Sequence, residues 1–350
     1  MSSNQKRVFY VNALAHPAYE AVMRARPDVR LDRIDNASTG DTVAPVLAAA
    51  HAFQIGAARD EIAATYHVGP DLLRRTPNLL LVSSNGAGFD TVNVKACTEA
   101  GVLVVNQSGG NKQSVAEHVL GMMLALAKRI VETDKVMRRQ ANMNRNAYLG
   151  TETHGKTIGI IGLGNVGTRV AELCRGLFSM RVIATDPNLT AEEMARRGAE
   201  KVDLDTLMQQ ADFVSVNCPL DDGSRGMIGA HQFGLMKPTA FFITTARGFI
   251  HDEAALAAVL ERKGLAGAGL DVWAKEPPPL DHPLLKFENV IISPHTAGVT
   301  HEARSNMGKI AAEQVLMALD GHTPPRMVNP EVWPVYAARF EKILGKRPGQ

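Results

Sequence analysis

Short apolar runs alternate with segments of helical pattern along the whole chain. Runs of four to six residues rich in Val, Ile, Leu and Phe are typical of buried strands, and the segments between them carry apolar residues at helical spacing. Strand-like runs cover residues 8–11, 29–34, 51–55, 79–82, 102–105, 157–161, 181–185, 213–217, 240–244, 266–270 and 290–293. Helical patterns include residues 18–26, 91–100, 169–178, 204–210 and 252–262. The alternation predicts an α/β protein with parallel sheets and crossover helices.

One glycine-rich turn organises this pattern. Gly162, Gly164 and Gly167 follow the apolar run 157–161 and open a helical segment. Such a turn needs glycine for the chain reversal, for close approach of a pyrophosphate and for helix-to-strand packing, and the helix N-terminus then binds phosphate. The next strand, residues 181–185, is followed by Asp186, about 20 residues past the last glycine, where an acid binds the adenine ribose. Strand, turn, helix, strand and acid together predict an NAD site, because a carboxylate repels the 2′-phosphate of NADP.

Two domains fit this order. The length of 350 residues is enough for about two cores. Five strand-like runs precede the glycine turn and predict a smaller α/β domain, whereas at least six from residue 157 onward complete a doubly wound sheet. The polar stretch 106–111 is interpreted as the first crossing between the domains.

A long helix is predicted after that crossing. Ser114 and Glu117 form a capping-box pattern, and apolar residues recur at helical spacing from Val115 to Ile130, so the helix is expected to end at about Ala141. Its apolar stripe and methionines indicate core or subunit contact rather than a ligand site. An exposed part of this stripe would suggest a dimer.

Composition excludes several classes of function. A net charge of +2 gives no sign of nucleic-acid or anionic-membrane binding. Three scattered cysteines, Cys97, Cys174 and Cys218, form neither a disulfide framework nor a metal motif. No signal peptide is recognisable and no apolar stretch is long enough to span a bilayer, so a soluble, cytoplasmic protein is expected.

Unusual residues follow many of the predicted strands. Cys218 and Pro219 follow one, residues 245–248 another, Asp271 a third and residues 294–298 the last. Ligands bind beyond the carboxyl ends of the strands in doubly wound sheets, so these residues should converge on one crevice. The loop 83–90 also follows a strand, and its glycines either present N–H groups to an anion or simply form a βα turn.

Arg247, Glu276 and His295 are the candidate catalytic residues. The planar guanidinium of Arg247 can hold a carboxylate and the neighbouring carbonyl oxygen together. A carboxylate from Glu276 on one imidazole nitrogen of His295 would orient the ring and raise its pKa, leaving the other nitrogen to exchange a proton with substrate. Asp271 is predicted to accept a hydrogen bond from the nicotinamide carboxamide. His118, His154, His231 and His251 lack such a setting and are interpreted as structural or exposed.

Four ordered motifs carry a family resemblance. They are residues 162–167 (GLGNVG), 245–248 (TARG), 269–277 (GLDVWAKEP) and 293–298 (SPHTAG). Together they resemble the D-isomer-specific 2-hydroxyacid dehydrogenases, which include phosphoglycerate, glycerate and D-lactate dehydrogenases. The resemblance implies that Arg247 binds the substrate carboxylate, that His295 is the acid/base and that Glu276 is its partner.

The resemblance also implies the remaining contacts and the domain plan. Predicted NAD contacts are Gly162, Gly164, Asn165, Val166, Gly167, Asp186, Cys218, Pro219, Thr245, Ala246, Asp271, His295, Ala297 and Gly298. Predicted substrate contacts are Asn85, Gly86, Arg247 and His295, and no metal is expected. A Rossmann-type NAD-binding domain, residues 106–298, would be inserted into a smaller flavodoxin-like substrate domain formed by residues 1–105 and 299–350. Residues 300–319 would be the helix that crosses back, and the NAD-binding domain would form a homodimer.

Two other functions share this fold. Formate dehydrogenase resembles the family but has glutamine in place of Glu276, so the glutamate argues against it. An NAD(H)-sensing corepressor keeps the same trio without turnover. Ala87 stands where phosphoglycerate enzymes often have a hydroxyl, and His251 where an apolar residue is common, so the sequence leaves the substrate open.

Overall fold

Two units make up the structure, a computed structural model that describes residues 5–38, 40–57, 59 and 62–349. The terminal unit consists of Met1–Asn111 and Thr300–Gln350, and the central unit is Lys112–Val299. The central unit is therefore inserted, in sequence, between the two parts of the terminal unit. Within the described residues no helix combines the length and apolar character that crossing a membrane requires.

The terminal unit is built on a five-stranded parallel sheet with the order β2-β1-β3-β4-β5. This is the flavodoxin-like strand order. The strands are β1 (Lys6–Val11), β2 (Val29–Ile34), β3 (Ala52–Ile55), β4 (Leu81–Ser84) and β5 (Leu103–Val105). The helices are α1 (Pro17–Arg24), α2 (Ala44–Ala49), α3 (Pro70–Arg75), α4 (Val94–Glu99), α12 (His301–Asp320) and α13 (Trp333–Leu344).

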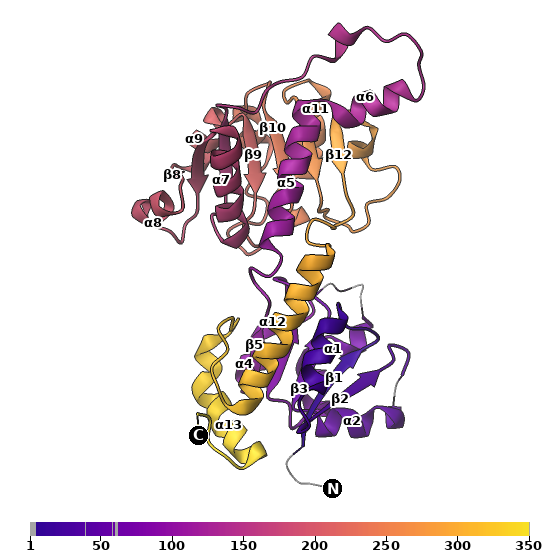
Figure 1. Cartoon of the computed structure of the whole chain (residues 1–350), viewed down its shortest axis with the longest axis vertical. Coiled ribbons are helices and arrows are strands. Elements are labelled where there is room, and N and C mark those ends of the chain that lie inside the picture. Colours follow the sequence, from indigo (N-terminus) through magenta and orange to yellow (C-terminus); the bar gives the residue numbers. More distant parts are fainter. Residues whose placement is uncertain (1–4, 39, 58, 60–61, 350) are drawn as a thin grey trace. The chain divides into compact units, whose positions relative to one another are not determined.

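Both faces of this sheet are covered by helices. One core packs α2, α3 and α4 against the sheet through residues such as Leu47 and Leu72. The opposite core packs α1, α12 and α13 through residues such as Met23, Val315 and Tyr336. The chain after residue 300 therefore completes the first domain, and Figure 1 shows α12 and α13 beside the sheet of the N-terminal strands.

The central unit is built on a seven-stranded parallel sheet with the order β12-β11-β10-β9-β6-β7-β8. The strands are β6 (Thr157–Ile161), β7 (Arg181–Thr185), β8 (Glu200–Lys201), β9 (Phe213–Val216), β10 (Phe241–Thr244), β11 (Gly267–Leu270) and β12 (Val290–Ile292). The helices are α5 (Lys112–Ala127), α6 (Ile130–Met137), α7 (Asn165–Phe178), α8 (Ala191–Arg196), α9 (Leu204–Gln210), α10 (Ala230–Leu235) and α11 (Glu253–Glu261). Short 3₁₀ turns lie at Gly40–Thr42, Ala64–Tyr66, Arg145–Tyr148, Gly248–Ile250, Pro283–Lys286 and Pro330–Val332.

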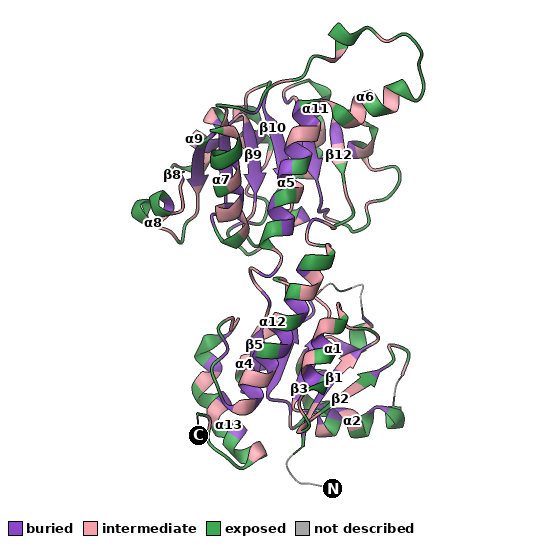
Figure 2. Ribbon diagram, viewed as in Figure 1, coloured by how far each residue is buried: buried purple, intermediate pink, exposed green. Residues whose placement is uncertain are grey.

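Helices again cover both faces of the sheet. Val119 of α5 and Val170 of α7 pack in one core, whereas Leu207 of α9, Phe233 of α10 and Leu256 of α11 pack in the other. Strands β6, β9, β10 and β11 are almost wholly buried, whereas both residues of β8 at the sheet edge are exposed; Figure 2 shows burial by colour. This burial explains why the inner strands read as continuous apolar runs rather than as alternating patterns. The predicted fold class, two doubly wound parallel-sheet domains, is confirmed.

The long helix predicted from Ser114 to about Ala141 is wrong in two respects. The helix begins at Lys112, so Ser114 lies inside it and is not an N-cap. It ends at Ala127, because Arg129 adopts a left-handed conformation (φ 54°) before α6 begins. The Arg129 guanidinium stabilises this break by pairing with Glu132 and donating to the carbonyl of Ala147. The apolar spacing in the sequence continues through Arg129, but the helical backbone is interrupted there.

The three turn glycines face different surroundings, which predicts different effects of substitution. A Cβ on Gly167 would lie 2.1 Å from the carbonyl oxygen of Gly162, whereas a Cβ on Gly164 would have no atom within 4 Å. Gly167→Ala should therefore lower the free energy of unfolding by about 1–3 kcal/mol. Gly164→Ala should lower it by less than about 1 kcal/mol. Urea denaturation of both variants measures this difference, and equal losses would contradict the packing seen at Gly167.

Candidate active site

The turn after β6 leaves one side open to a ligand. Gly162 has φ 88°, and a Cβ there would lie 2.6 Å from the main-chain nitrogen of Cys218. Gly164 is the N-cap of α7 and has no side chain to cap the helix, and a Cβ there would have no atom within 4 Å. Asn165 and Val166, two predicted cofactor contacts, are the first two residues of α7. This is the arrangement that a pyrophosphate requires.

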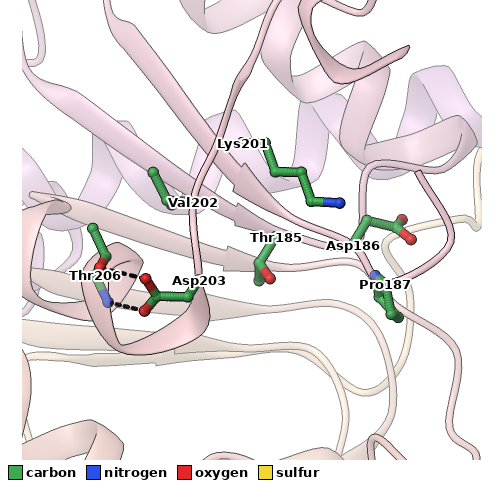
Figure 3. Close-up of a pocket in the computed structure, with 7 residues that line it drawn as sticks. All are labelled: Thr185, Asp186, Pro187, Lys201, Val202, Asp203 and Thr206. Atoms are coloured by element: carbon green, nitrogen blue, oxygen red, sulfur yellow. Dashed lines mark hydrogen bonds between the residues drawn. The ribbon is translucent and has the colours of Figure 1, made fainter. Parts of the chain in front are cut away.

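Asp186, which directly follows β7, is hydrogen-bonded to this turn. Its Oδ2 accepts a hydrogen bond from the Leu163 N–H at 3.0 Å, and its Oδ1 accepts one from the Asn188 N–H at 3.0 Å. Asp186 lines a shallow pocket of about 540 Å³ beyond the ends of β7 and β8. Figure 3 shows Asp186 and Lys201 at one end of this pocket, with the Asp203 carboxylate bonded to Thr206 at the other.

Buried polar atoms beyond β9 and β10 also fit a bound dinucleotide. Asn217 Oδ1 and Thr245 Oγ1 are inaccessible to solvent and have no hydrogen-bond partner among the described residues. Such groups are rare unless a ligand or water satisfies them. Burial raises the pKa of Cys218 to about 12, so its thiol is neutral. Asn217 was missed by the sequence reasoning, although it directly precedes the predicted contacts Cys218 and Pro219.

His295 and Glu276 are in direct contact. His295 Nδ1 lies 2.8 Å from Glu276 Oε2, and the other carboxylate oxygen accepts the Trp273 N–H at 3.0 Å. The hydrogen bond that His295 donates to Glu276 raises the pKa of His295, although burial and the positive charge of Arg247 oppose it. Burial alone would raise the pKa of Glu276, but the bonds from His295 and from the Trp273 N–H bring it below its usual value. The pair therefore favours an imidazolium beside a carboxylate.

Arg247 belongs to the same cluster. It directly follows the buried Ala246 at the end of β10, and its Nη1 donates to the Ala246 carbonyl at 2.8 Å. Its charge lies near enough to His295 and Glu276 to change the pKa of both. The central unit alone thus brings the three predicted catalytic residues together, while their roles stay predictions.

Asp271 is fully buried, with 0% exposure, and binds the loop that carries His295. Its Oδ1 accepts from Ser293 Oγ at 2.5 Å and from the Thr296 N–H at 2.8 Å, and its Oδ2 accepts from the Ala297 N–H at 2.9 Å. Its main-chain carbonyl accepts the His295 N–H at 2.8 Å. The predicted nicotinamide contact of Asp271 stays a prediction, and its observed contacts hold the loop 293–298.

His118 adds a contact that the sequence did not indicate. It lies on α5, and its Nε2 is 2.9 Å from Ser293 Oγ and 3.8 Å from Asp271 Oδ1. From the sequence this histidine is interpreted as structural or exposed, because it lacks a setting like that of His295 with Glu276. Its position at helical spacing from Ser114 and Met122 indicated only that it shares the packed side of the helix.

Asn85 and Gly86 lie in the terminal unit, in the loop after β4. The Gly86 N–H donates to Gln107 Oε1 at 2.6 Å, and the Gln107 N–H donates to the Gly86 carbonyl at 2.7 Å. The Gly86 N–H, which was predicted to contact the substrate carboxylate, therefore already donates to Gln107. Asn85 lines a pocket of about 250 Å³ within this unit, together with Gln54 and Arg304.

The remaining predicted contacts lie at the carboxyl ends of the central strands. The Pro219 carbonyl accepts Ser224 Oγ at 2.7 Å, and Ala297 and Gly298 belong to the loop after β12. Within the described part of the chain, no group of three or more His, Cys, Asp or Glu side chains is placed to hold a metal ion.

Comparison with known proteins identifies the family. The family model described as D-isomer specific 2-hydroxyacid dehydrogenase, NAD binding domain, matches residues 120–297. A glyoxylate reductase of Korarchaeum cryptofilum is 36% identical over 277 residues, which are 78% of this chain and 83% of that protein. The chain belongs to the D-isomer-specific 2-hydroxyacid dehydrogenase family. It is an NAD-dependent oxidoreductase of this family.

Two further relatives extend the comparison. A D-3-phosphoglycerate dehydrogenase of Archaeoglobus fulgidus is 39% identical over 262 residues, which are 75% of this chain and 49% of that protein. The chain thus spans about half the length of that relative. The structure of a D-lactate dehydrogenase from Aquifex aeolicus, complexed with NAD and lactic acid, is 25% identical, with a TM-score of 0.76 and coverage of 92% of this chain and 98% of that one.

The His295–Glu276 contact predicts a pH dependence. With His295 as the predicted acid/base, reduction of a carbonyl would require its protonated form, and the raised pKa of His295 keeps the ring protonated to higher pH than an ordinary imidazole. Glu276→Gln removes the charge that raises this pKa, so the midpoint of the fall in kcat/KM with rising pH should move to lower pH. The pH profile of NADH oxidation measures this shift, with the exposed Glu152→Gln as the matched control. An unchanged midpoint would show that Glu276 does not set the pKa observed in the pH profile.

Proposed function

We propose that the chain reduces a short 2-oxoacid to the (2R)-2-hydroxyacid, reversibly, with His295 as the acid/base. The observation that carries this proposal is the 2.8 Å contact of His295 with Glu276 in a cluster that also contains Arg247. NADH, when bound, supplies the hydride. The glycine N-cap of α7 and the buried polar atoms of Asn217 and Thr245 beyond β9 and β10 are the features that fit this cofactor.

Each member of the trio has a distinct task in this proposal. Arg247 binds the substrate carboxylate through its planar fork and polarises the adjacent carbonyl. The Nδ1–H of His295 is held by Glu276, which leaves Nε2 to donate a proton to the developing alkoxide. In the reverse direction the same nitrogen accepts the proton from the hydroxyl group.

The relatives support a small substrate. Those that match over most of their length include glyoxylate reductases and a glyoxylate/hydroxypyruvate reductase B of Pectobacterium carotovorum, which is 38% identical over 268 residues. We therefore propose glyoxylate and hydroxypyruvate as the first substrates to test. Asn85 stays the predicted contact of the terminal unit.

A variant of His295 tests the reaction. His295→Ala should lower kcat by about 100- to 10,000-fold, the usual contribution of a positioned acid/base, and leave NADH affinity nearly unchanged. NADH oxidation is followed with glyoxylate, hydroxypyruvate, pyruvate, phosphohydroxypyruvate and bulkier 2-oxoacids, and cofactor binding by fluorescence. The exposed His231→Ala is the control. Wild-type turnover by His295→Ala would remove this residue from the mechanism, and tight NADH binding without any turnover would favour the NAD(H)-sensing alternative.

We further propose that the central unit forms a homodimer through the segment 130–149. Ile130, Met137 and Leu149 are apolar and exposed, with 71% and 75% exposure for the last two, and Figure 1 shows this segment extending from the sheet beyond α6. Exposed apolar side chains along one projecting segment are typical of an interaction surface.

The oligomeric state tests this surface. The double variant Met137→Glu with Leu149→Glu should convert a dimer into a monomer in light scattering coupled to gel filtration, because the interface would have to bury two charges. Leu280→Glu, at a residue with 97% exposure elsewhere in the unit, should leave the mass unchanged. A wild-type protein that is monomeric at micromolar concentration would overturn the dimer.

A further inference from the structure

A hydrogen-bond chain runs from α5 to the loop that carries the acid/base. His118 Nε2 lies 2.9 Å from Ser293 Oγ, and Ser293 Oγ lies 2.5 Å from Asp271 Oδ1. All three residues belong to the central unit. His118 and Ser293 have no part in the proton transfer proposed for His295, Glu276 and Arg247.

The chemistry of the middle residue fixes the direction of this chain. Serine has a single hydroxyl proton, and an ionised carboxylate only accepts hydrogen bonds. The Ser293 hydroxyl therefore donates to Asp271, and its remaining lone pairs accept from His118. This assigns the proton to Nε2 of His118, since a bare Nε2 would face a Ser293 oxygen with no proton left to give.

Asp271 connects this hydrogen-bond chain to the loop 293–298, which carries His295. Its carboxylate receives the N–H groups of Thr296 and Ala297, and its carbonyl receives the N–H of His295. His295 itself adopts a left-handed backbone conformation, with φ 55°. A residue other than glycine keeps that conformation only where its neighbours determine it. The direction of the imidazole thus depends on how the Asp271 carboxylate is oriented.

We propose that His118 and Ser293 are positioning residues, which orient the buried Asp271 carboxylate and through it the loop that presents His295 to the substrate. This inference rests on the proposed function, because it concerns the same acid/base. His118 is suited to the task because its helix is packed against β10 and β11 through Val119, Met122 and Leu126, so its backbone is fixed.

Two amides of different length test the assignment to Nε2. Gln places its amide nitrogen where His carries Nε2, whereas Asn places its amide nitrogen near the position of Nδ1. His118→Gln should therefore retain kcat to within about 3-fold, while His118→Asn and His118→Leu should lower kcat by about 10- to 100-fold, the cost of a misplaced catalytic group. NADH affinity, measured by fluorescence, should change far less than kcat in all three. Equal activity of the Gln and Asn variants would overturn the proposal.

A double variant tests whether His118 acts through Ser293. Adding His118→Leu to Ser293→Ala should cause little further loss of kcat, because the chain is already broken. Multiplying losses would show that His118 acts on its own and would overturn the proposed chain. The exposed His154→Leu is the matched control and should keep wild-type kcat and Tm.

The outcomes separate this inference from the proposed function. A wild-type protein without NADH-dependent reductase activity would reject the reaction itself. An active wild type with an equally active His118→Leu would reject only the positioning role. If His118→Leu does not fold, the comparison of His118→Gln with His118→Asn still decides.

Discussion

The parallel direction of all seven central strands is the constraint on which the site depends. Because every strand ends at the same edge, residues separated by more than 100 positions lie along one edge of the sheet: Gly162 after β6, Asp186 after β7, Cys218 after β9, Arg247 after β10 and Asp271 after β11. The chemistry of the family needs a dinucleotide and a charged trio at one place. In a parallel sheet each of these residues follows its own strand at the shared carboxyl edge. A buried strand therefore fixes the position of each one.

At that edge, the carboxylate of Asp271 holds the loop 293–298 in place. Asp271 binds Ser293, Thr296 and Ala297 through its side chain, which places a fully buried negative charge among four donors when the His295 N–H to its carbonyl is included. Burying a charge without such partners would cost several kcal/mol, so the loop and the carboxylate stabilise one another. The left-handed conformation of His295, which costs a non-glycine residue roughly 1–2 kcal/mol, is held by the same contacts.

The sequence predicted those parts of the molecule that local pattern encodes. The runs 29–34, 157–161 and 181–185 became strands with the predicted bounds, since branched apolar residues bounded by turns leave few alternatives. The two-residue β8 was missed because so short a strand has no periodicity. The break at Arg129 was missed because apolar spacing persists through it, and only a side chain bonded to Glu132 and to the carbonyl of Ala147 reveals it. His118 was missed for a related reason: its partners lie about 150 to 175 residues further on, and no spacing rule joins them.

The pKa of His295 depends on two neighbouring charges, those of Glu276 and Arg247, which act in opposite directions. Burial lowers the pKa of the imidazole, and so does the positive charge of the nearby Arg247. Glu276 raises it, and the net direction is upward because the carboxylate touches Nδ1 at 2.8 Å and shares a hydrogen bond with it, whereas the guanidinium acts only through space. A charge-assisted hydrogen bond combines Coulomb attraction with directed bonding, so one contact outweighs a like charge at longer range. A neutral amide at residue 276 would keep the geometry but lose most of this advantage, so His295 would stay protonated over a narrower range of pH.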